Sequence, residues 1–351
     1  MSAPLPMEGF APPSRSAYGL PVTLRISGGR AIQLDDVLGE GTLGTVFAGR
    51  TEGSRFSRGV AVKFFDRLSA GDRAHVGPGL ARTLAACACV CDPRIVQIYD
   101  FDLSRQHPFV VTELVDGGAL EALMAGFARQ GVPFPPDLAV LIGLKIAEGL
   151  AAAQESLLPD GSRAGVTHGN VNANEVFVTW TGEVKVSDFG LAAAFGGSSR
   201  PRPVATLRQL VPMSPEVACG GVADARSDVF SLGIVMWQML LGQRFSPHTS
   251  PTELFHLVRS GRVHASLAEQ ALLPPLRDVL RRATQADPRR RFAGAHELAT
   301  ALHATAALMG IPDVPAFIEC GVEDAFMRRA PRSGVRGRAS HEAGDAPRSR
   351  H

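Results

Sequence analysis

The chain has 351 residues, 45% hydrophobic content and a formal net charge of +2, so it can bury one large core or two smaller ones. No run of about 18 apolar residues is present, and a membrane-spanning helix is not expected. The N-terminal residues lack the basic start and apolar stretch of a secretory signal, and the five cysteines make no disulfide framework, so we expect a cytoplasmic protein.

Residues 1–20 are rich in Pro and Ser, which predicts a disordered N-terminal tail. A strand-rich unit follows over residues 21–116. Strand-like segments at 22–26 and 30–34 flank Ser27-Gly28-Gly29, which is typical of a hairpin. Further strand-like segments cover residues 37–41, 44–50, 60–65, 95–102 and 109–114, with one helical stretch near 80–90. This pattern predicts a small antiparallel sheet.

Residues 117–310 favour helices. Asp137 is expected to cap a helix that reaches about Glu155, because apolar side chains recur on one stripe. Residues 229–241 are apolar on nearly every side, which predicts a helix buried all round. Shorter helices are expected at residues 252–260, 276–284 and 295–309. A strand-rich half followed by a helix-rich half indicates an α+β protein with two lobes and a cleft between them.

Residues 311–351 form a C-terminal extension that ends in an arginine-rich tail. Residues 328–351 contain seven arginines against Glu342 and Asp345, a local net charge of +5. Their low apolar content predicts disorder. Such an arm can contact nucleic acid or acidic surfaces, but a solvated tail is the simpler interpretation. Beyond weak contacts of this tail, nucleic acid is not an expected partner.

Three of the five cysteines, Cys87, Cys89 and Cys91, alternate along the chain near the predicted helical stretch. This is no recognised zinc spacing, and no pair of histidines follows at a ligand-like interval. We therefore expect small buried residues at a helix end rather than a metal site.

Gly39, Gly41, Gly44 and Val46 form a G-x-G-x-x-G-x-V motif. Glycines allow backbone N–H groups to approach phosphates without an intervening side chain. A plain β-turn is the alternative interpretation of this motif taken alone.

Lys63 ends the sequence V-A-V-K on a predicted strand, 19 residues after Gly44. A lysine in this context pairs the α- and β-phosphates of a nucleotide. The chain has three lysines beside 33 arginines, which favours a specific role for Lys63 over an ordinary surface charge.

Two loop motifs lie in the helical half. His168 opens a loop similar to H-R-D-L-x-x-x-N, and Asp188-Phe189-Gly190 matches D-F-G. With the glycine motif and Lys63, they resemble the bacterial Ser/Thr protein kinases of the eukaryotic type, over about residues 33–305. The resemblance implies a two-lobed kinase fold that binds ATP and Mg²⁺, with a small antiparallel sheet in the N-lobe and a mainly helical C-lobe.

The resemblance also implies roles for further residues at the cleft. Thr112 corresponds to the gatekeeper of the hinge, and Glu113 and Val115 follow it there. Ala61 belongs to the nucleotide pocket, and Asp188 corresponds to the acid that binds the metal ion.

Other matched residues are structural. Asp228 corresponds to an anchoring residue on the buried central helix. Ser214-Pro215-Glu216 resembles A-P-E, whose Glu pairs with an Arg at the position of Arg291. We therefore expect a buried ion pair between Glu216 and Arg291.

The loop after His168 departs from the family pattern. Gly169 and Asn170 replace the Arg and the Asp, Asn172 replaces a Lys, and Glu175 replaces a metal-binding Asn. The amide of Asn170 cannot accept the proton of an attacking hydroxyl, and a positioned base is worth on the order of 10²–10⁴-fold in rate. Glu175, or Asn174 with a one-residue slip, could still bind magnesium through oxygen.

A second departure concerns the partner of Lys63. The Glu that normally pairs with it would fall near Thr83, and no Glu occurs between residues 52 and 113. Pro78-Gly79 is expected to interrupt the first turns of the helix. We therefore expect Lys63 and Asp188 to pair directly when no nucleotide is bound.

The segment before Glu216 departs as well. Where the family often has G-T-x-x-Y, this chain has Arg208, Gln209 and Pro212. The loss of Arg at Gly169 removes the residue that reads activation-loop phosphate. Hydroxyl side chains that another kinase could modify are Ser198, Ser199 and Thr206, although solvated loop residues are the simpler interpretation.

Three hypotheses of function follow. The first is a pseudokinase that binds ATP and Mg²⁺ and signals through an unidentified protein partner. The second is a weakly active Ser/Thr kinase, because positioning and metal supply much of phosphoryl-transfer catalysis. The third is an interaction module without nucleotide.

Overall fold

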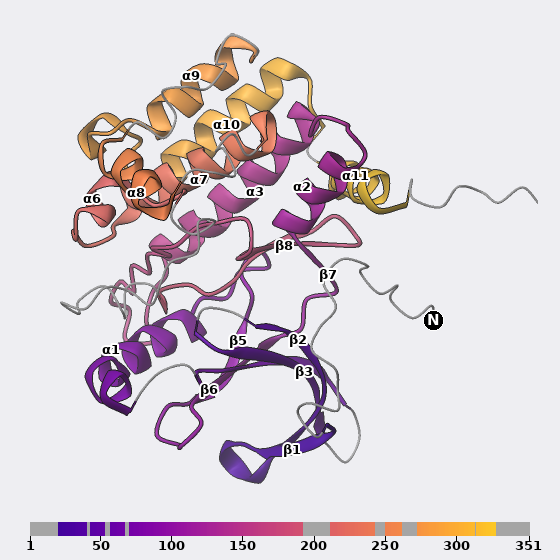
Figure 1. The fold of residues 1–351 in the computed structure, drawn as a ribbon, viewed down its shortest axis with the longest axis vertical. Coiled ribbons are helices and arrows are strands. Elements are labelled where there is room, and N and C mark those ends of the chain that lie inside the picture. The colour runs from indigo at the N-terminus through magenta and orange to yellow at the C-terminus, as the bar shows by residue number, and fades with distance from the viewer. Residues whose placement is uncertain are drawn as a thin grey trace, which may run out of the picture.

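Strands gather in one lobe of the molecule and helices in the other, as Figure 1 shows. The computed structural model describes residues 20–40, 43–52, 57–66, 70–191, 211–242, 250–261, 272–312 and 314–327. The expected two-lobed α+β architecture is confirmed. Several predictions concern residues outside these ranges: the two tails over residues 1–19 and 328–351, and Gly41, Ser198, Ser199, Thr206, Arg208 and Gln209.

The N-lobe is built on a six-stranded antiparallel sheet with the order β1-β2-β3-β4-β6-β5. Its strands are β1 (Val22–Arg25), β2 (Ala31–Glu40), β3 (Thr45–Glu52), β4 (Gly59–Phe64), β5 (Ile98–Asp102) and β6 (Phe109–Glu113). Alternate side chains such as Ile32, Val60 and Val62 enter one core, as in a sheet with one covered face. The 3-10 turn η2 (Ser27–Gly29) joins β1 to β2, which confirms the predicted hairpin.

Strand β2 joins two segments that were expected to be separate strands, at 30–34 and 37–41. Register shifts along β2, the first between Leu34 and Asp36, absorb the irregularity. Asp35 at this shift pairs with Arg50 of β3, with Nε and Oδ2 2.9 Å apart. The adjacent residues Asp35 and Asp36 therefore mark a bulge within one strand and not a break between two strands.

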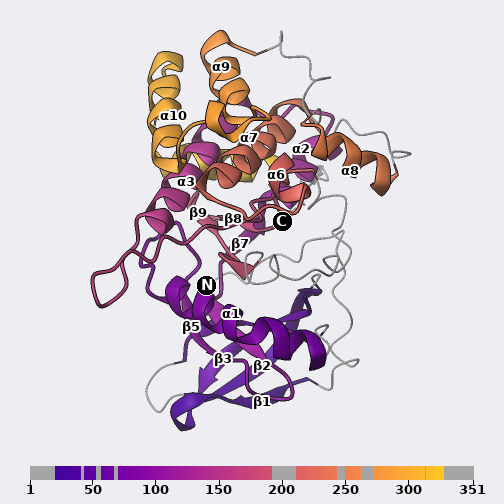
Figure 2. The same cartoon turned by 90° about the vertical axis from the view of Figure 1, so that its left-hand side faces the viewer.

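Helix α1 (Ala70–Ala88) lies across the sheet, as Figure 2 shows. The expectation that Pro78-Gly79 would interrupt the helix was wrong, because α1 continues through Pro78. Beyond the proline, Leu80 and Leu84 are buried in one cluster with Phe65. The burial of two leucines, worth about 1.5–3 kcal/mol each, offsets the roughly 3 kcal/mol that an internal proline costs.

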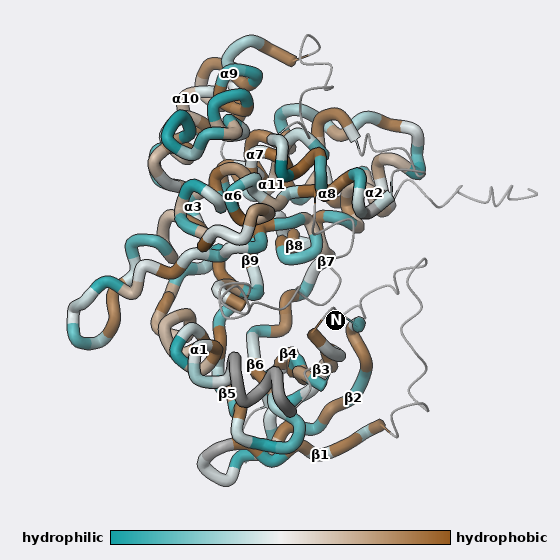
Figure 3. The backbone as a smooth tube through the Cα atoms, turned by 60° about the vertical axis from the view of Figure 1, so that its left-hand side comes forward, coloured by the Kyte–Doolittle hydropathy of each residue, from teal (hydrophilic) through white to brown (hydrophobic). Residues whose placement is uncertain are grey.

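The C-lobe consists mainly of helices packed around α7. They are α2 (Leu120–Arg129), α3 (Pro136–Gln154), α6 (Pro215–Ala218), α7 (Ala225–Leu241), α8 (Pro251–Arg259), α9 (Pro274–Ala283), the 3-10 turn η4 (Pro288–Arg290), α10 (Ala295–Met309) and α11 (Pro315–Met327). In Figure 3, the outer helix α9 carries long teal stretches, in line with its exposed Arg281 and Arg282. The predicted burial of the central helix is confirmed, with twelve buried residues on α7.

Two helix starts differ from expectation. Helix α3 begins at Pro136, and Asp137 lies in its first turn without a capping hydrogen bond, so the prediction of an Asp137 cap was wrong. Proline is preorganised for the first helical position and needs no N–H there. Helix α7 begins four residues before 229, because the side chain of Asp224 accepts hydrogen bonds from Arg226 N and Ser227 N.

A second, three-stranded antiparallel sheet lies where the lobes meet, in the order β7-β8-β9. It consists of β7 (Gly117–Ala119), β8 (Val176–Thr179) and β9 (Val184–Val186). Helices were expected directly after residue 116, and β7 was not. A Cβ at Gly117 would overlap the backbone carbonyl of Val178, so glycine is needed for β7 to approach β8.

All five cysteines are free thiols. Cys87 is buried as expected, whereas Cys89 and Cys91 are exposed, which corrects that part of the prediction. Helix α1 ends at Ala88, so these two residues lie beyond the face that packs on the sheet. Among the described helices, none is both long and apolar enough to cross a bilayer.

Candidate functional site

The predicted residues on the N-lobe side of the cleft are brought together by strand register. Val46 of β3 stands opposite Lys63 of β4, and Gly39 of β2 stands opposite Val46. Ala61 stands opposite Thr112 at the end of β6. Backbone register alone therefore gathers these positions on neighbouring strands.

Gly44 belongs to the same group for a steric reason. Its φ is 155°, and a Cβ at this position would overlap the carbonyl oxygen of Phe64. Thr45 Oγ1, beside it, donates to Asp66 Oδ2 at 3.2 Å. The glycine motif is therefore held close against the end of β4.

Lys63 and Asp188 form an ion pair across the cleft, which confirms the direct pairing expected from the sequence. Both side chains are largely buried, with 15% and 21% of their side-chain surface exposed. Burial lowers the pKa of Lys63, but the charges of Asp188 and Glu175 and the hydrogen bond to Asp188 outweigh it, so the pKa is raised overall. The ammonium group is therefore fixed beside Asp188.

Glu175 lies beside the same pair. Ser187 Oγ is 3.2 Å from Glu175 Oε2, and Ser187 N donates to the backbone carbonyl of Glu175 at 2.8 Å. Burial, and then the charge of Asp188, raise the pKa of the Glu175 carboxyl to about 8. Two carboxyl groups thus share one small site beside the Lys63 ammonium.

The Asp188-Phe189-Gly190 segment is fixed on both sides. Asp188 has a φ of 57°, in the left-handed region. Phe189 packs on the ring of His168, with centroids 4.8 Å apart and planes at 47°. Burial lowers the pKa of His168 to about 4, so the imidazole is neutral at pH 7.

The contacts that helix α1 makes with this segment, among the described side chains, come from the uncharged residues Thr83 and Cys87. A Cβ at Gly190 would overlap Cγ2 of Thr83, so the two residues touch directly. Cys87 Sγ donates to the carbonyl oxygen of Phe189 at 3.4 Å. Burial raises the pKa of the Cys87 thiol to about 12. Thr83 thus occupies the expected position on α1, and packing stands in for the missing Glu.

The loop after His168 keeps its shape although its chemistry is altered. Asp228 of the central helix accepts hydrogen bonds from His168 N at 2.9 Å and Gly169 N at 2.7 Å, so it anchors this loop. Gly169 has a φ of 74°, which glycine adopts without strain. The buried side chain of Asn172 donates to Asn170 O at 2.8 Å.

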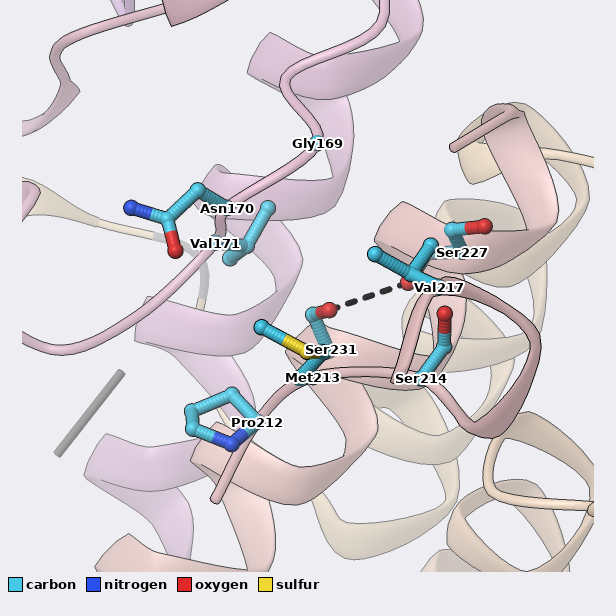
Figure 4. Close-up of a pocket in the computed structure, with 9 residues that line it drawn as sticks. All are labelled: Gly169, Asn170, Val171, Pro212, Met213, Ser214, Val217, Ser227 and Ser231. Carbon is cyan, nitrogen blue, oxygen red and sulfur yellow. Dashed lines mark hydrogen bonds between the residues drawn. The ribbon is translucent and has the colours of Figure 1, made fainter. Parts of the chain in front are cut away.

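A small pocket opens beside Asn170, and Figure 4 shows its lining. Gly169, Asn170, Val171, Pro212, Met213, Ser214, Val217, Ser227 and Ser231 line it. Ser231 Oγ donates to the carbonyl oxygen of Ser227 at 3.0 Å. These nine lining residues include no carboxylate, imidazole or amine, so none of them offers a general base.

The hinge is attached to the C-lobe by a lysine that sequence reasoning missed. Lys185 Nζ of β9 lies 2.9 Å from Glu113 Oε1 and 2.9 Å from the carbonyl oxygen of Pro93. Glu113 N donates to Gln97 O at 2.9 Å. The Glu113 carboxylate is thus engaged by Lys185 of β9. Val115 follows at the exit of the hinge and is half-buried.

Glu216 and Arg291 form the ion pair expected from the sequence. Arg291 Nη1 and Nη2 donate to the two carboxylate oxygens at 2.7 and 2.8 Å. The Arg291 side chain is fully buried, and its guanidinium lies 4.7 Å from the ring centroid of Phe230. The pair ties Glu216, before α7, to Arg291, directly after η4. Both residues are far in sequence from Lys63, and we interpret their pair as structural.

Sequence comparisons identify relatives of this chain. Residues 32–299 match the family model described as protein tyrosine and serine/threonine kinase. The serine/threonine-protein kinase PknL of Mycobacterium tuberculosis is 31% identical over 267 residues, which is 75% of this chain and 63% of that protein. PknB of Mycobacterium leprae is 29% identical over 272 residues, which is 76% of this chain and 41% of that protein.

Solved structures share the fold. The PknI kinase domain of Mycobacterium tuberculosis superposes with a TM-score of 0.56 and 20% identity, covering 78% of this chain and 95% of that one. The curated relatives are longer, since the match to PknL spans 63% of its length.

Proposed function

Because the chain belongs to the protein tyrosine and serine/threonine kinase family, we propose that it binds ATP and Mg²⁺ and acts as a pseudokinase. Its output is then a protein contact: it serves as a scaffold or allosteric partner of another protein whose identity the chain does not reveal. One observation carries this proposal, namely that the pocket beside Asn170 has no lining residue able to take a proton.

The nucleotide side of the cleft supports binding. Lys63 supplies a largely buried cation for the phosphates, and Gly44 brings the backbone of the glycine motif against the end of β4 with no side chain between. Thr112, Glu113 and Val115 supply the hinge for the base.

Asp188 and Glu175 fit a magnesium ion. Magnesium prefers oxygen ligands, and the carboxyl groups of Asp188 and Glu175 lie together here beside Lys63. These two side chains would hold the ion, and when bound it would neutralise charge on the phosphates. Glu175 lies against Asp188, so we assign it the second ligand position, and the side chain of Asn174 is the alternative.

The acceptor side lacks what transfer requires. An amide at Asn170 accepts no proton near neutral pH, and loss of a positioned base costs about 3–5 kcal/mol of barrier. Asn172 is buried and hydrogen-bonded to the loop, so it brings no positive charge to the transferred phosphate. The nearby His168 is buried under Phe189 and cannot replace the base.

A weakly active Ser/Thr kinase is the second candidate. The presence of both Lys63 and Asp188 at the cleft favours it, because positioning and metal are the largest contributions to phosphoryl transfer.

Thermal unfolding with and without millimolar ATP and Mg²⁺ tests the binding. A ligand at about 100 times its Kd adds roughly 2.7 kcal/mol of stability, so a clear rise in Tm is expected. No rise in Tm would contradict nucleotide binding and favour the third hypothesis, an interaction module that binds no nucleotide. Transfer of labelled γ-phosphate to the protein itself or to a generic substrate then separates the two candidates: robust turnover that Asp188→Ala abolishes would overturn the pseudokinase.

A further inference from the structure

Helix α11 lies beyond residue 299, where the family match ends. Its inward side chains Ile318, Val322 and Ala325 are 2–3% exposed and belong to the main core of the C-lobe. Gln130, just after α2, donates through Nε2 to two carbonyl oxygens near the end of α11, at 3.0 and 2.7 Å. The helix is therefore docked as part of the lobe, beside α2 in Figure 1.

Glycines mark the points where α11 meets the lobe. A Cβ at Gly182, in the turn between β8 and β9, would overlap the carbonyl oxygen of Pro315 and lie 2.8 Å from Glu319 N. On α11 itself, a Cβ at Gly321 would lie 2.6 Å from Leu138 Cδ2. The backbone of α11 lies directly against the backbone of the turn at Gly182. This close contact fixes the register in which α11 packs there.

Two contacts link α11 to the hinge. The ring of Phe326 packs edge-on against Trp180, with centroids 5.5 Å apart. Trp180 N in turn donates to the carbonyl oxygen of Asp116 at 3.1 Å. Asp116 directly follows Val115, the last of the predicted hinge residues.

Strands β8 and β9, which flank the turn at Gly182, lead to the proposed metal site. Glu175 directly precedes β8, and Asp188 follows β9 by two residues. Lys185 of β9 holds the hinge through Glu113. Each strand is only three or four residues long, so the turn held by α11 is one short strand away from both carboxyl groups.

We propose that α11 is a positioning element of the nucleotide site: it holds the β8–β9 turn and Trp180, and through them the hinge and the two carboxyl groups. This inference rests on the proposed nucleotide binding. Coupling between two sites is reciprocal, so nucleotide should also strengthen the docking of α11.

A matched pair of substitutions in the full chain tests this. Val322→Asp places a charge in the buried contact, whereas Ala316→Asp places the same charge on the exposed side of the same helix. Should Val322→Asp fail to fold, Phe326→Ala removes the ring contact to Trp180 and some packing on the C-lobe core without adding a charge, and Cys320→Ala on the exposed side is its control.

Amide hydrogen exchange without nucleotide is the first measurement. With Val322→Asp, we expect amides of residues 176–188 to exchange at least fivefold faster than in the wild type, and no change with Ala316→Asp. Equal exchange in both variants overturns the inference. This measurement needs no ligand, so it decides the role of α11 even if the protein fails to bind nucleotide.

The affinity for Mg²⁺ and ATP, measured well below the Tm of each variant, is the second measurement. Val322→Asp should raise the Kd about tenfold, and Ala316→Asp should leave it within twofold. A lower Tm with an unchanged Kd would make α11 merely structural. In the wild type, ATP should slow exchange in residues 318–327. If the wild type binds no ATP, the proposed function fails and not the mechanical coupling.

Discussion

Lys63 of β4 contacts Asp188 directly, and the contact joins the two lobes across the proposed nucleotide cleft. The residue of α1 that faces this region, Thr83, has no charge and packs on Gly190 instead. Lys63 therefore has carboxyl partners only from the C-lobe among the described residues, namely Asp188 and the neighbouring Glu175.

Replacement of Lys63 by Met should weaken binding of ATP with Mg²⁺ at least tenfold, because the ammonium group that we propose for the phosphates is lost. Two carboxyl groups would also remain without their partner, and removal of one member of a buried pair costs about 3 kcal/mol. Calorimetric titration and urea unfolding measure the two effects. Lys145→Met is the control: its ammonium lies 3.4 Å from Glu148 within α3, in a similarly buried ion pair, and affinity should stay within twofold. Unchanged affinity in Lys63→Met would remove Lys63 from the site.

Asn170→Asp alone should restore little phosphoryl transfer, less than tenfold over the wild type. The new carboxylate could accept a proton, but Asn172 would still bring no charge, and Thr83 would still leave Lys63 without its usual partner. Transfer of labelled γ-phosphate gives the rate, and Asn170→Asp combined with Asp188→Ala sets the background. A gain of about 100-fold from the single change would show that the base was the only defect.

Glu216→Gln should destabilise the protein by roughly 3 kcal/mol at neutral pH, because Arg291 is fully buried and would lose its charged partner. Glu297→Gln is the control, since the Glu297–Arg282 pair is about half exposed and is worth less than about 1 kcal/mol. Urea unfolding of both variants measures the difference.

The same pair predicts a pH dependence. Burial raises the pKa of Glu216, but the hydrogen bonds and charge of Arg291 outweigh it, so the pKa in the folded protein is lowered. A lowered carboxyl pKa gives stability that is fully present above the unfolded value of about 4.3 and is lost as pH falls through the folded value. The gap between wild type and Glu216→Gln should therefore shrink below about pH 4. A gap that is constant from pH 7 to 3.5 would contradict this.

Thiol labelling should distinguish Cys87 from the other four cysteines. Cys87 is 4% exposed, and burial raises its pKa to about 12, so its thiolate is scarce at pH 8. Iodoacetamide on the native protein should add four groups, seen by intact mass, and Cys87→Ala should leave that number unchanged. Labelling of Cys87 as fast as Cys89 would mean that the contact between α1 and Phe189 opens readily.

Much of the site was predictable because short motifs carry it. The glycine motif, Lys63 and Asp188 are each set by local sequence, and strand register then brings them together. The Glu216–Arg291 pair was predictable from resemblance only, since 75 residues separate its members.

What the sequence concealed depended on packing. Lys185 lies 72 residues from Glu113, and no local pattern connects them. Strands β7 to β9 are too short to show alternation. The continuation of α1 through Pro78 depended on the burial of Leu80 and Leu84. Helix α11 did leave a signal, since Ile318, Val322 and Ala325 recur at helical spacing.

The turn at Gly182 sets a rule for related chains. Its φ is 81°, and even one methyl group there would collide with Pro315. A homologue with any bulkier residue at the position of Gly182 must therefore place its last helix elsewhere or lack it. The residue at this one position thus indicates whether a helix like α11 packs against the β8–β9 turn.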